Sequence, residues 1–282
     1  MSKKKVAVVT DSTACLPVSL IEELGIPVIP LNVLWDGDEL KDGVHITPSQ
    51  FYTRLASSST MPTTSQPSVG EFVEFYEKVA ETADEIVGVF ISDTLSGTLQ
   101  SARQAKDMVD FPVHLIDSRI TATPLGVMAV SAHKMAEAGA NADEIVAAIK
   151  DLPKTSDVFF VADTLEFLHR GGRIGGAARF VGSLLSMKPI LHVEDGVVAP
   201  LARVRTKKKA LKRMMDDFVE ATKGKDVIGV GVLHSEAAAD ANNIKKDLEN
   251  IFPGVPVILS EITPVVGTHI GPGALGVGYV TR

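Results

Sequence analysis

Apolar and polar positions in the first half of the chain alternate between two kinds of segment. Four short runs are almost continuously apolar and rich in β-branched residues, as expected of strands buried on both faces. These runs cover residues 6–9, 26–34, 86–91 and 113–116. Because helical patterns separate several of these runs, the first half is predicted to form a mostly parallel sheet covered by helices.

The helix that follows residue 68 has the clearest signals. Apolar residues recur at helical spacing from Val69 to Ala83 and would form one face. Ser68 followed by Glu71 matches a capping box, which sets the start of this helix at residue 69. Further helices are predicted over residues 97–109 and 125–137.

A polar stretch over residues 153–157 precedes a second unit with a different pattern. Strands are predicted over 158–162, 184–193, 197–204, 227–233 and 255–262, with helices over 206–222 and 236–248. Glu194-Asp195-Gly196 is typical of a hairpin turn, which makes the flanking strands antiparallel. We therefore expect an α/β protein of two domains: residues 1–155 with a mostly parallel sheet covered by helices, and residues 156–282, an α/β domain with a mixed sheet.

Composition narrows the class of protein. The 282 residues carry a net charge of −7, which argues against general nucleic-acid binding. Cys15 is the only cysteine, which excludes an intrachain disulfide and fits the reducing cytoplasm. The apolar run near the N-terminus is too short for a signal peptide, and no stretch approaches the ~20 apolar residues of a membrane span. We expect a cytoplasmic protein without stable membrane insertion.

Known cofactor and metal motifs do not fit this sequence. The seven histidines lack metal-ligand spacing, and no P-loop segment is present. Gly271, Gly273 and Gly276 match a dinucleotide pattern, but only six residues follow it, so neither the required helix nor the later acid fits. No cofactor and no metal are therefore expected.

Polar residues follow three of the predicted parallel strands. They are Asp11-Ser12-Thr13, the segment 92–98, and Asp117-Ser118. Because ligands bind outside the carboxyl ends of parallel strands, these loops should converge on one crevice.

Two hydroxyl-rich loops are candidates for an anion site. Thr64 and Ser65 lie in the first, over residues 62–68, and Ser96 lies beside Gly97 in the second. Each loop runs into a helix, whose first N–H groups favour an anion. The alternative is that these hydroxyls only satisfy local turns and caps. Neither loop contains a strong base, which favours binding over catalysis.

Arginine and histidine occur in glycine-rich surroundings further along the chain. Arg170 and Arg173 flank Gly171-Gly172, and their guanidinium groups suit carboxylate or phosphate oxygens. Arg205, in the segment Arg203-Val204-Arg205-Thr206, is a candidate for further positive charge. The alternative for the segment around Arg170 is a helix end with an exposed arginine. His269 lies among glycines, which suggests an exposed loop in which its charge changes near neutral pH.

These segments together resemble the DegV family of fatty-acid-binding proteins, which serve bacterial fatty-acid kinases. The resemblance rests on six ordered motifs that span nearly the whole chain: Asp11-Ser12-Thr13, Thr64-Ser65-Gln66-Pro67-Ser68, Leu95-Ser96-Gly97-Thr98, Arg170-Gly171-Gly172-Arg173-Ile174, Val204-Arg205-Thr206 and Thr268-His269-Ile270-Gly271-Pro272-Gly273. One segment departs from the family pattern, because Ala122 and Pro124 stand where Ser and Gly are usual.

The resemblance implies a lipid carrier rather than an enzyme. One long-chain fatty acid would be buried with its carboxylate on Thr64, Ser65 and Ser96, a cage of neutral hydroxyls. A separate ATP-dependent kinase subunit would convert the carboxylate to an acyl phosphate for phospholipid synthesis. The resemblance places Arg170, Arg205 and His269, with Arg173, at the mouth of the site, for phosphoryl transfer or kinase docking. A small-anion sensor and a stand-alone phosphotransferase or hydrolase remain the alternatives.

Overall fold

The computed structural model describes residues 4–180 and 187–282, and their strands form three sheets. The strands are β1 (Lys4–Asp11), β2 (Val28–Ile29), β3 (Asn32–Trp35), β4 (Asp38–Lys41), β5 (Thr63–Ser65), β6 (Ala83–Phe90), β7 (Val113–Asp117), β8 (Ser156–Val161), β9 (Lys188–Glu194), β10 (Val197–Val204), β11 (Val227–His234), β12 (Val257–Glu261) and β13 (Leu275–Thr281). The α-helices are α1 (Val18–Leu24), α2 (Pro48–Ser57), α3 (Val69–Ala80), α4 (Thr98–Lys106), α5 (Ala122–Glu137), α6 (Ala142–Ile149), α7 (Glu166–Arg170), α8 (Lys207–Thr222), α9 (Ala238–Ile251) and α10 (Pro264–Ile270). Short 3-10 helices are η1 (Ser12–Ala14), η2 (Leu152–Thr155) and η3 (Gly175–Phe180).

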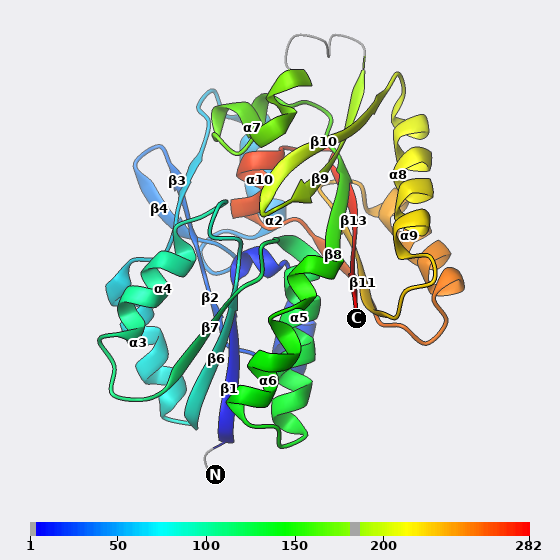
Figure 1. Cartoon of the computed structure of the whole chain (residues 1–282). Helices are drawn as coiled ribbons and strands as arrows, with labels where there is room; N and C mark the ends of the chain where they lie inside the picture. Colours follow the sequence, from blue (N-terminus) through cyan, green and yellow to red (C-terminus); the bar gives the residue numbers. More distant parts are fainter. Residues whose placement is uncertain (1–3, 181–186) are drawn as a thin grey trace.

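The first sheet is parallel throughout and has the strand order β2-β1-β6-β7. Alternate residues of β1 and β6 face opposite layers, with α3 and α4 on one side and α5 and α6 on the other (Figure 1). Helix α3 begins where the capping box predicts, because Ser68 Oγ accepts from the Glu71 amide and the Glu71 carboxylate accepts from the Ser68 amide. The parallel sheet expected for the first half is confirmed.

The second sheet is mixed, with the strand order β10-β9-β8-β13-β11-β12. The predicted hairpin is confirmed, since β9 and β10 pair antiparallel around Asp195 and Gly196, both at positive φ. Strand β13 lies at the centre of this sheet, between β8 and β11, although the sequence pattern gave no strand there. Of the strand predicted over 184–193, residues 184–186 lie outside the described residues, and β9 begins at Lys188.

Helix α5 lies between the two large sheets (Figure 1). It packs against β1 and β6 on one side and against β8, β11 and β13 on the other, within one continuous apolar core. The close approach of α5 to the mixed sheet depends on Gly231 of β11, because a Cβ atom at this position would lie 2.2 Å from Thr123 Cβ of α5. The predicted boundary between residues 155 and 156 stays a prediction; β8 begins at Ser156, directly after η2.

A third, small antiparallel sheet has the order β4-β3-β5. The sequence pattern treated residues 26–34 as one strand and residues 62–68 as a loop, whereas the structure divides the first into β2 and β3 and places Thr64 and Ser65 on β5. Trp35, Phe51 and Val265 share an apolar cluster that joins this sheet to α2 and α10. The small sheet and α10 therefore form one packing unit.

Candidate functional site

A deep cavity lies between the parallel sheet, the mixed sheet and the small sheet. It contains about 930 Å³ of space not filled by atoms, part of it open to solvent. Most of its lining is apolar: Leu31, Ile91, Leu95, Ala122, Val158, Phe160, Leu168, Val193, Val198, Leu233, Ile262, Val265, Val266, Ile270 and Ala274. A mostly apolar pocket with a few polar groups is typical of a site for an organic ligand.

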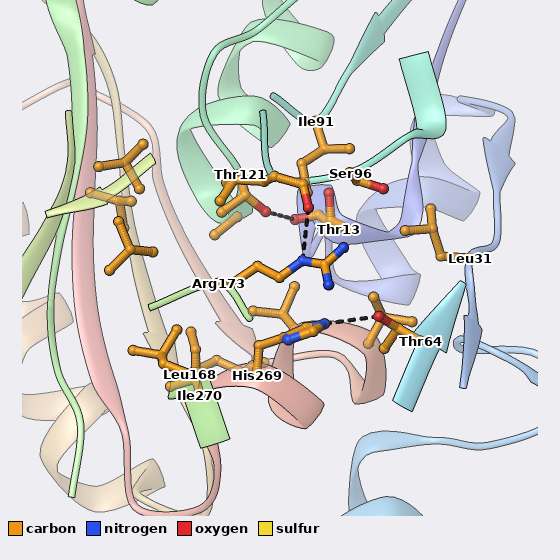
Figure 2. Close-up of a pocket in the computed structure, with 18 of the residues that line it drawn as sticks. Thr13, Leu31, Thr64, Ile91, Ser96, Thr121, Leu168, Arg173, His269 and Ile270 are labelled. Atoms are coloured by element: carbon orange, nitrogen blue, oxygen red, sulfur yellow. Dashed lines mark hydrogen bonds between the residues drawn. The ribbon is translucent and has the colours of Figure 1, made fainter. Parts of the chain in front are cut away.

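The polar residues of the lining are Thr13, Thr64, Ser65, Gln66, Ser96, Thr121, Arg173 and His269, here called the polar cluster. Figure 2 shows Thr13, Ser96, Arg173, His269 and Thr64 gathered in one region of the cavity. The predicted convergence of the strand ends is present, because the buried carboxylate of Asp11, the last residue of β1, accepts from the Ile91 amide just after β6 (2.8 Å). The Asp117-Ser118 loop does not line the cavity, but Thr121 just beyond it does.

Thr64 and His269 form the central contact of the polar cluster. Thr64 Oγ1 lies 2.8 Å from His269 Nε2, although the two residues are 205 positions apart in sequence. Strand β5 supplies Thr64 and the last turn of α10 supplies His269. His269 is therefore part of a helix and partly buried, rather than in the exposed glycine loop that the sequence suggested.

His269 is neutral at physiological pH. Burial, aided by the nearby Arg173 charge, lowers its pKa to about 4. Its Nδ1 is enclosed and has no hydrogen-bond partner among the described residues. Since a buried acceptor without a partner is more common in proteins than a buried N–H without one, we assign the proton to Nε2, which donates to Thr64.

The hydroxyls of Ser65 and Ser96 are held in a similar way. Ser65 Oγ accepts from Asn32 Nδ2 (3.4 Å), and Ser96 Oγ accepts from the Thr98 amide (3.3 Å). Ser96 therefore satisfies a local turn, as in the alternative interpretation, although the N-cap of α4 is Gly97; Ser96 also lines the cavity. Because each of the three hydroxyls accepts a bond from the protein, each retains a hydrogen to donate to an anionic ligand.

Arg173 brings a positive charge into the cavity lining. Its Nε donates to the Leu95 carbonyl (3.0 Å) and its Nη1 to the Gly171 carbonyl (2.9 Å), which fixes the guanidinium beside Ser96 and His269 (Figure 2). The polar cluster therefore contains one guanidinium beside its neutral hydroxyls. A guanidinium and several hydroxyls together suit a carboxylate or a phosphate.

Arg170 and Arg205, the other two candidate arginines, do not line the cavity. Arg170 ends α7 and forms an ion pair with Glu166 (2.7 Å), one helical turn earlier, with both side chains more than half exposed. Arg205 follows β10 and is exposed. Gly172, which lies between Arg170 and Arg173, has a positive φ of 70°. The backbone turns at this glycine, so that only Arg173 lines the cavity.

Sequence reasoning missed Thr13, Thr121 and Gln66 as members of the polar cluster. Thr13 and Gln66 belong to two of the motifs that carry the family resemblance. Their positions next to Ser12 and Ser65 could have marked them as site residues. Thr121 and Ala122 fall in the segment that departs from the family pattern, yet both line the cavity.

Two kinds of feature are absent from residues 4–180 and 187–282. No group of three or more His, Cys, Asp or Glu side chains is placed to hold a metal ion. No helix in the same ranges is both long and apolar enough to cross a membrane.

Comparison with known proteins agrees with this fold. A family model described as an uncharacterised protein of the DegV family matches residues 5–282. A DegV domain-containing protein of Listeria innocua is 40% identical over 278 residues, 98% of this chain and 98% of the relative.

Two solved structures are similar over nearly the full length. A DegV family protein from Thermus thermophilus, described as binding fatty acid, has a TM-score of 0.89 and 34% identity, covering 99% of this chain and 100% of that one. DegV of Bacillus subtilis, described as a fatty acid binding protein, has a TM-score of 0.90 and 35% identity, with coverage of 99% and 100%. The family resemblance seen in the motifs is confirmed, and the chain belongs to the DegV family.

Proposed function

We propose that this chain binds one long-chain fatty acid, with the acyl tail in the apolar part of the cavity and the carboxylate on Thr64, Ser65 and Ser96. The observation that carries the proposal is a deep apolar cavity with hydroxyl donors gathered in one region of its wall. The fatty-acid binding described for the Thermus thermophilus and Bacillus subtilis relatives supports it. An apolar lining of this extent does not suit a sensor of small anions.

The hydrogen-bond geometry supports a role in binding without catalysis by this chain. Ser96 Oγ lies 2.8 Å from Thr98 Oγ1 and has no histidine partner in the described ranges, so nothing there activates it as a nucleophile. His269 is bonded to Thr64 and is neutral, so it orients a donor rather than supplying a positive charge. We therefore favour a carrier over a stand-alone phosphotransferase or hydrolase.

The proposal extends to a second protein. A separate ATP-dependent kinase subunit would transfer a phosphoryl group to the bound carboxylate, and the acyl phosphate would feed phospholipid synthesis in the cytoplasm. Arg173, beside Ser96, is positioned to stabilise negative charge as the phosphoryl group arrives. Because Arg170 and Arg205 lie outside the lining, we assign them to docking of the kinase.

The first test is to denature the purified protein and analyse the released lipid by mass spectrometry. A long-chain fatty acid at one equivalent per chain is the expected result, and it also identifies the preferred tail. Protein that is empty and takes up no added fatty acid would refute the binding proposal.

The kinase step needs its own test. Arg205→Ala should retain its fatty acid and lose association with the kinase, whereas Arg173→Ala should retain association and form little acyl phosphate. Loss of kinase association in the Arg173 variant but not in the Arg205 variant would reverse this assignment.

A further inference from the structure

A second, more polar pocket lies beside the cavity described above and is here called the outer pocket. It contains about 570 Å³ of space not filled by atoms, part of it open to solvent. It is bounded by residues 93–97 after β6, by Gly172, Arg173 and Gly175, and by Val197 and Val198 of β10. Because polar residues and glycines make up most of this lining, the outer pocket does not suit an acyl tail.

The outer pocket and the cavity share one wall. Both spaces are lined by Leu95, Ser96, Arg173 and Val198. Of the three hydroxyls proposed to hold the carboxylate, only Ser96 belongs to this shared wall, since Thr64 and Ser65 line the cavity alone. A carboxylate oxygen bonded to Ser96 is therefore the part of the bound fatty acid that lies nearest the outer pocket.

Arg173 has donors left for an anion at the shared wall. Its Nε donates to the Leu95 carbonyl and its Nη1 to the Gly171 carbonyl. A guanidinium carries five N–H groups, so these two bonds leave about three without a partner in residues 4–180 and 187–282. The backbone contacts hold the guanidinium in place, and its remaining N–H groups suit phosphate oxygens.

The charges of the outer pocket favour an anion. Asp93 and Arg173 are the charged side chains of its lining. Asp93 forms an ion pair with Arg103 of α4 (2.6 Å), which offsets its negative charge. Glu194 lies opposite Val197 in the hairpin, but it is exposed and does not belong to the lining. The positive charge of Arg173 at the shared wall is therefore in excess.

The product of the proposed phosphoryl transfer has a larger and more highly charged head than a fatty acid. In that transfer a carboxylate oxygen forms a bond to the γ-phosphorus of ATP, and the bond from this phosphorus to ADP breaks. The phosphate of the product carries about two negative charges, where the carboxylate carried one. The outer pocket has room for this group, because even an added Cβ at Gly172 would meet no atom within 4 Å.

We propose that the outer pocket is a phosphate subsite, which holds the phosphate of a long-chain acyl phosphate while the acyl tail stays in the cavity. This inference rests on the proposed function, because it gives a place to the product of the phosphoryl transfer. Arg173 binds the phosphate at the shared wall, and Ser96 donates to the oxygen that joins the acyl group to phosphorus. The γ-phosphate of ATP approaches the carboxylate through the same pocket.

The first test is a crystal structure with the methylene phosphonate analogue of palmitoyl phosphate. In this probe a methylene group replaces the bridging oxygen and prevents hydrolysis. We expect its phosphorus atom in the outer pocket, in contact with Arg173, and its tail in the cavity. A phosphonate group that lies within the cavity, beside Thr64 and His269, or anywhere else outside the outer pocket overturns the proposal.

The second test compares the affinities of Val197→Trp for palmitate and for the same phosphonate. Val197 lines the outer pocket but not the cavity and is 36% exposed, so a larger side chain there reduces the outer pocket alone. Phosphonate binding should weaken by about tenfold or more, as overpacking of its subsite requires, and palmitate binding by less than about twofold. Val219→Trp on α8, where Val219 is 39% exposed, is the matched control and should leave both affinities unchanged.

Each other outcome has its own meaning. Equal effects of Val197→Trp on the two ligands, or no effect on either, overturn the proposal. Native protein that binds palmitate but not the phosphonate also overturns it and leaves the proposed carrier function intact, whereas native protein that binds neither ligand refutes both. If Val197→Trp does not fold, the position of phosphorus in the crystal of the native complex decides.

Discussion

The hydrogen bond between Thr64 and His269 predicts a measurable contribution to stability even without ligand. Thr64→Val keeps the shape of the side chain and replaces the hydroxyl by a methyl group. His269 Nε2, now 2.8 Å from Thr64 Oγ1, would lose its partner, and Nδ1 already has none among the described residues. A partly buried neutral imidazole would then have both nitrogens unsatisfied, at a cost of about 1–3 kcal/mol.

For a chain of 282 residues, each kcal/mol of unfolding free energy corresponds to about 2 °C in Tm. We therefore expect Thr64→Val to lower the Tm of the ligand-free protein by about 2–6 °C, measured by calorimetry after removal of lipid. Thr64→Ser is the matched control, because it keeps the hydroxyl and should lie closer to the native protein. Equal stability of the valine variant and the native protein would show that this bond does not hold β5 against α10.

Three further outcomes follow from single contacts. Ser96→Ala should weaken fatty-acid binding by about 1–3 kcal/mol in a titration, because it removes a donor to the carboxylate. Ser19→Ala on the exposed face of α1 should have no effect, and equal affinities of the Ser96 variant and the native protein would exclude Ser96 from the site. Gly171→Ala should destabilise the protein by about 1–3 kcal/mol and displace the imidazole, since the new Cβ would lie 2.2 Å from His269 Nδ1. Gly70→Ala, with open space around it, is the control, and similar denaturation midpoints for the two variants would contradict the predicted clash. The hydrogen bond to Asp157 (2.9 Å) raises the pKa of His192 above 6.5, so this pair contributes stability that is complete below pH 6.5 and is lost as the pH rises through the folded-state pKa; Asp157→Asn should remove that dependence, and an unchanged pH profile would count against the pair.

Continuous apolar runs predicted the parallel sheet well, because strands such as β6 are buried on both faces and show this directly in sequence. The same signal failed at β13. Gly276 and Gly278 make that segment look like a loop, but a Cβ atom at Gly278 would lie 2.6 Å from Pro124 of α5. The glycines serve tertiary packing, which a local pattern does not contain.

The candidate site was predicted in part for a similar reason. Thr64, Ser65, Ser96, Arg173 and His269 all line the cavity, and each lies in a segment that the sequence analysis singled out. Sequence gave no means to separate Arg173 from Arg170, since both flank the same glycine pair. The different positions of the two arginines depend on the backbone turn at Gly172. They also depend on the Leu95 carbonyl, 78 positions earlier in the chain, which accepts a hydrogen bond from Arg173.

The central place of β13 has a consequence for synthesis of the chain. Residues 275–281 are made after every other strand of the described residues, yet they pair with both β8 and β11. Without β13, the mixed sheet consists of two separate groups, β10-β9-β8 and β11-β12. A ribosome-bound chain therefore presents two separate groups of strands with open edges until β13 emerges, and such edges are prone to wrong pairing. Folding of this half, and closure of the cavity with it, therefore waits for β13.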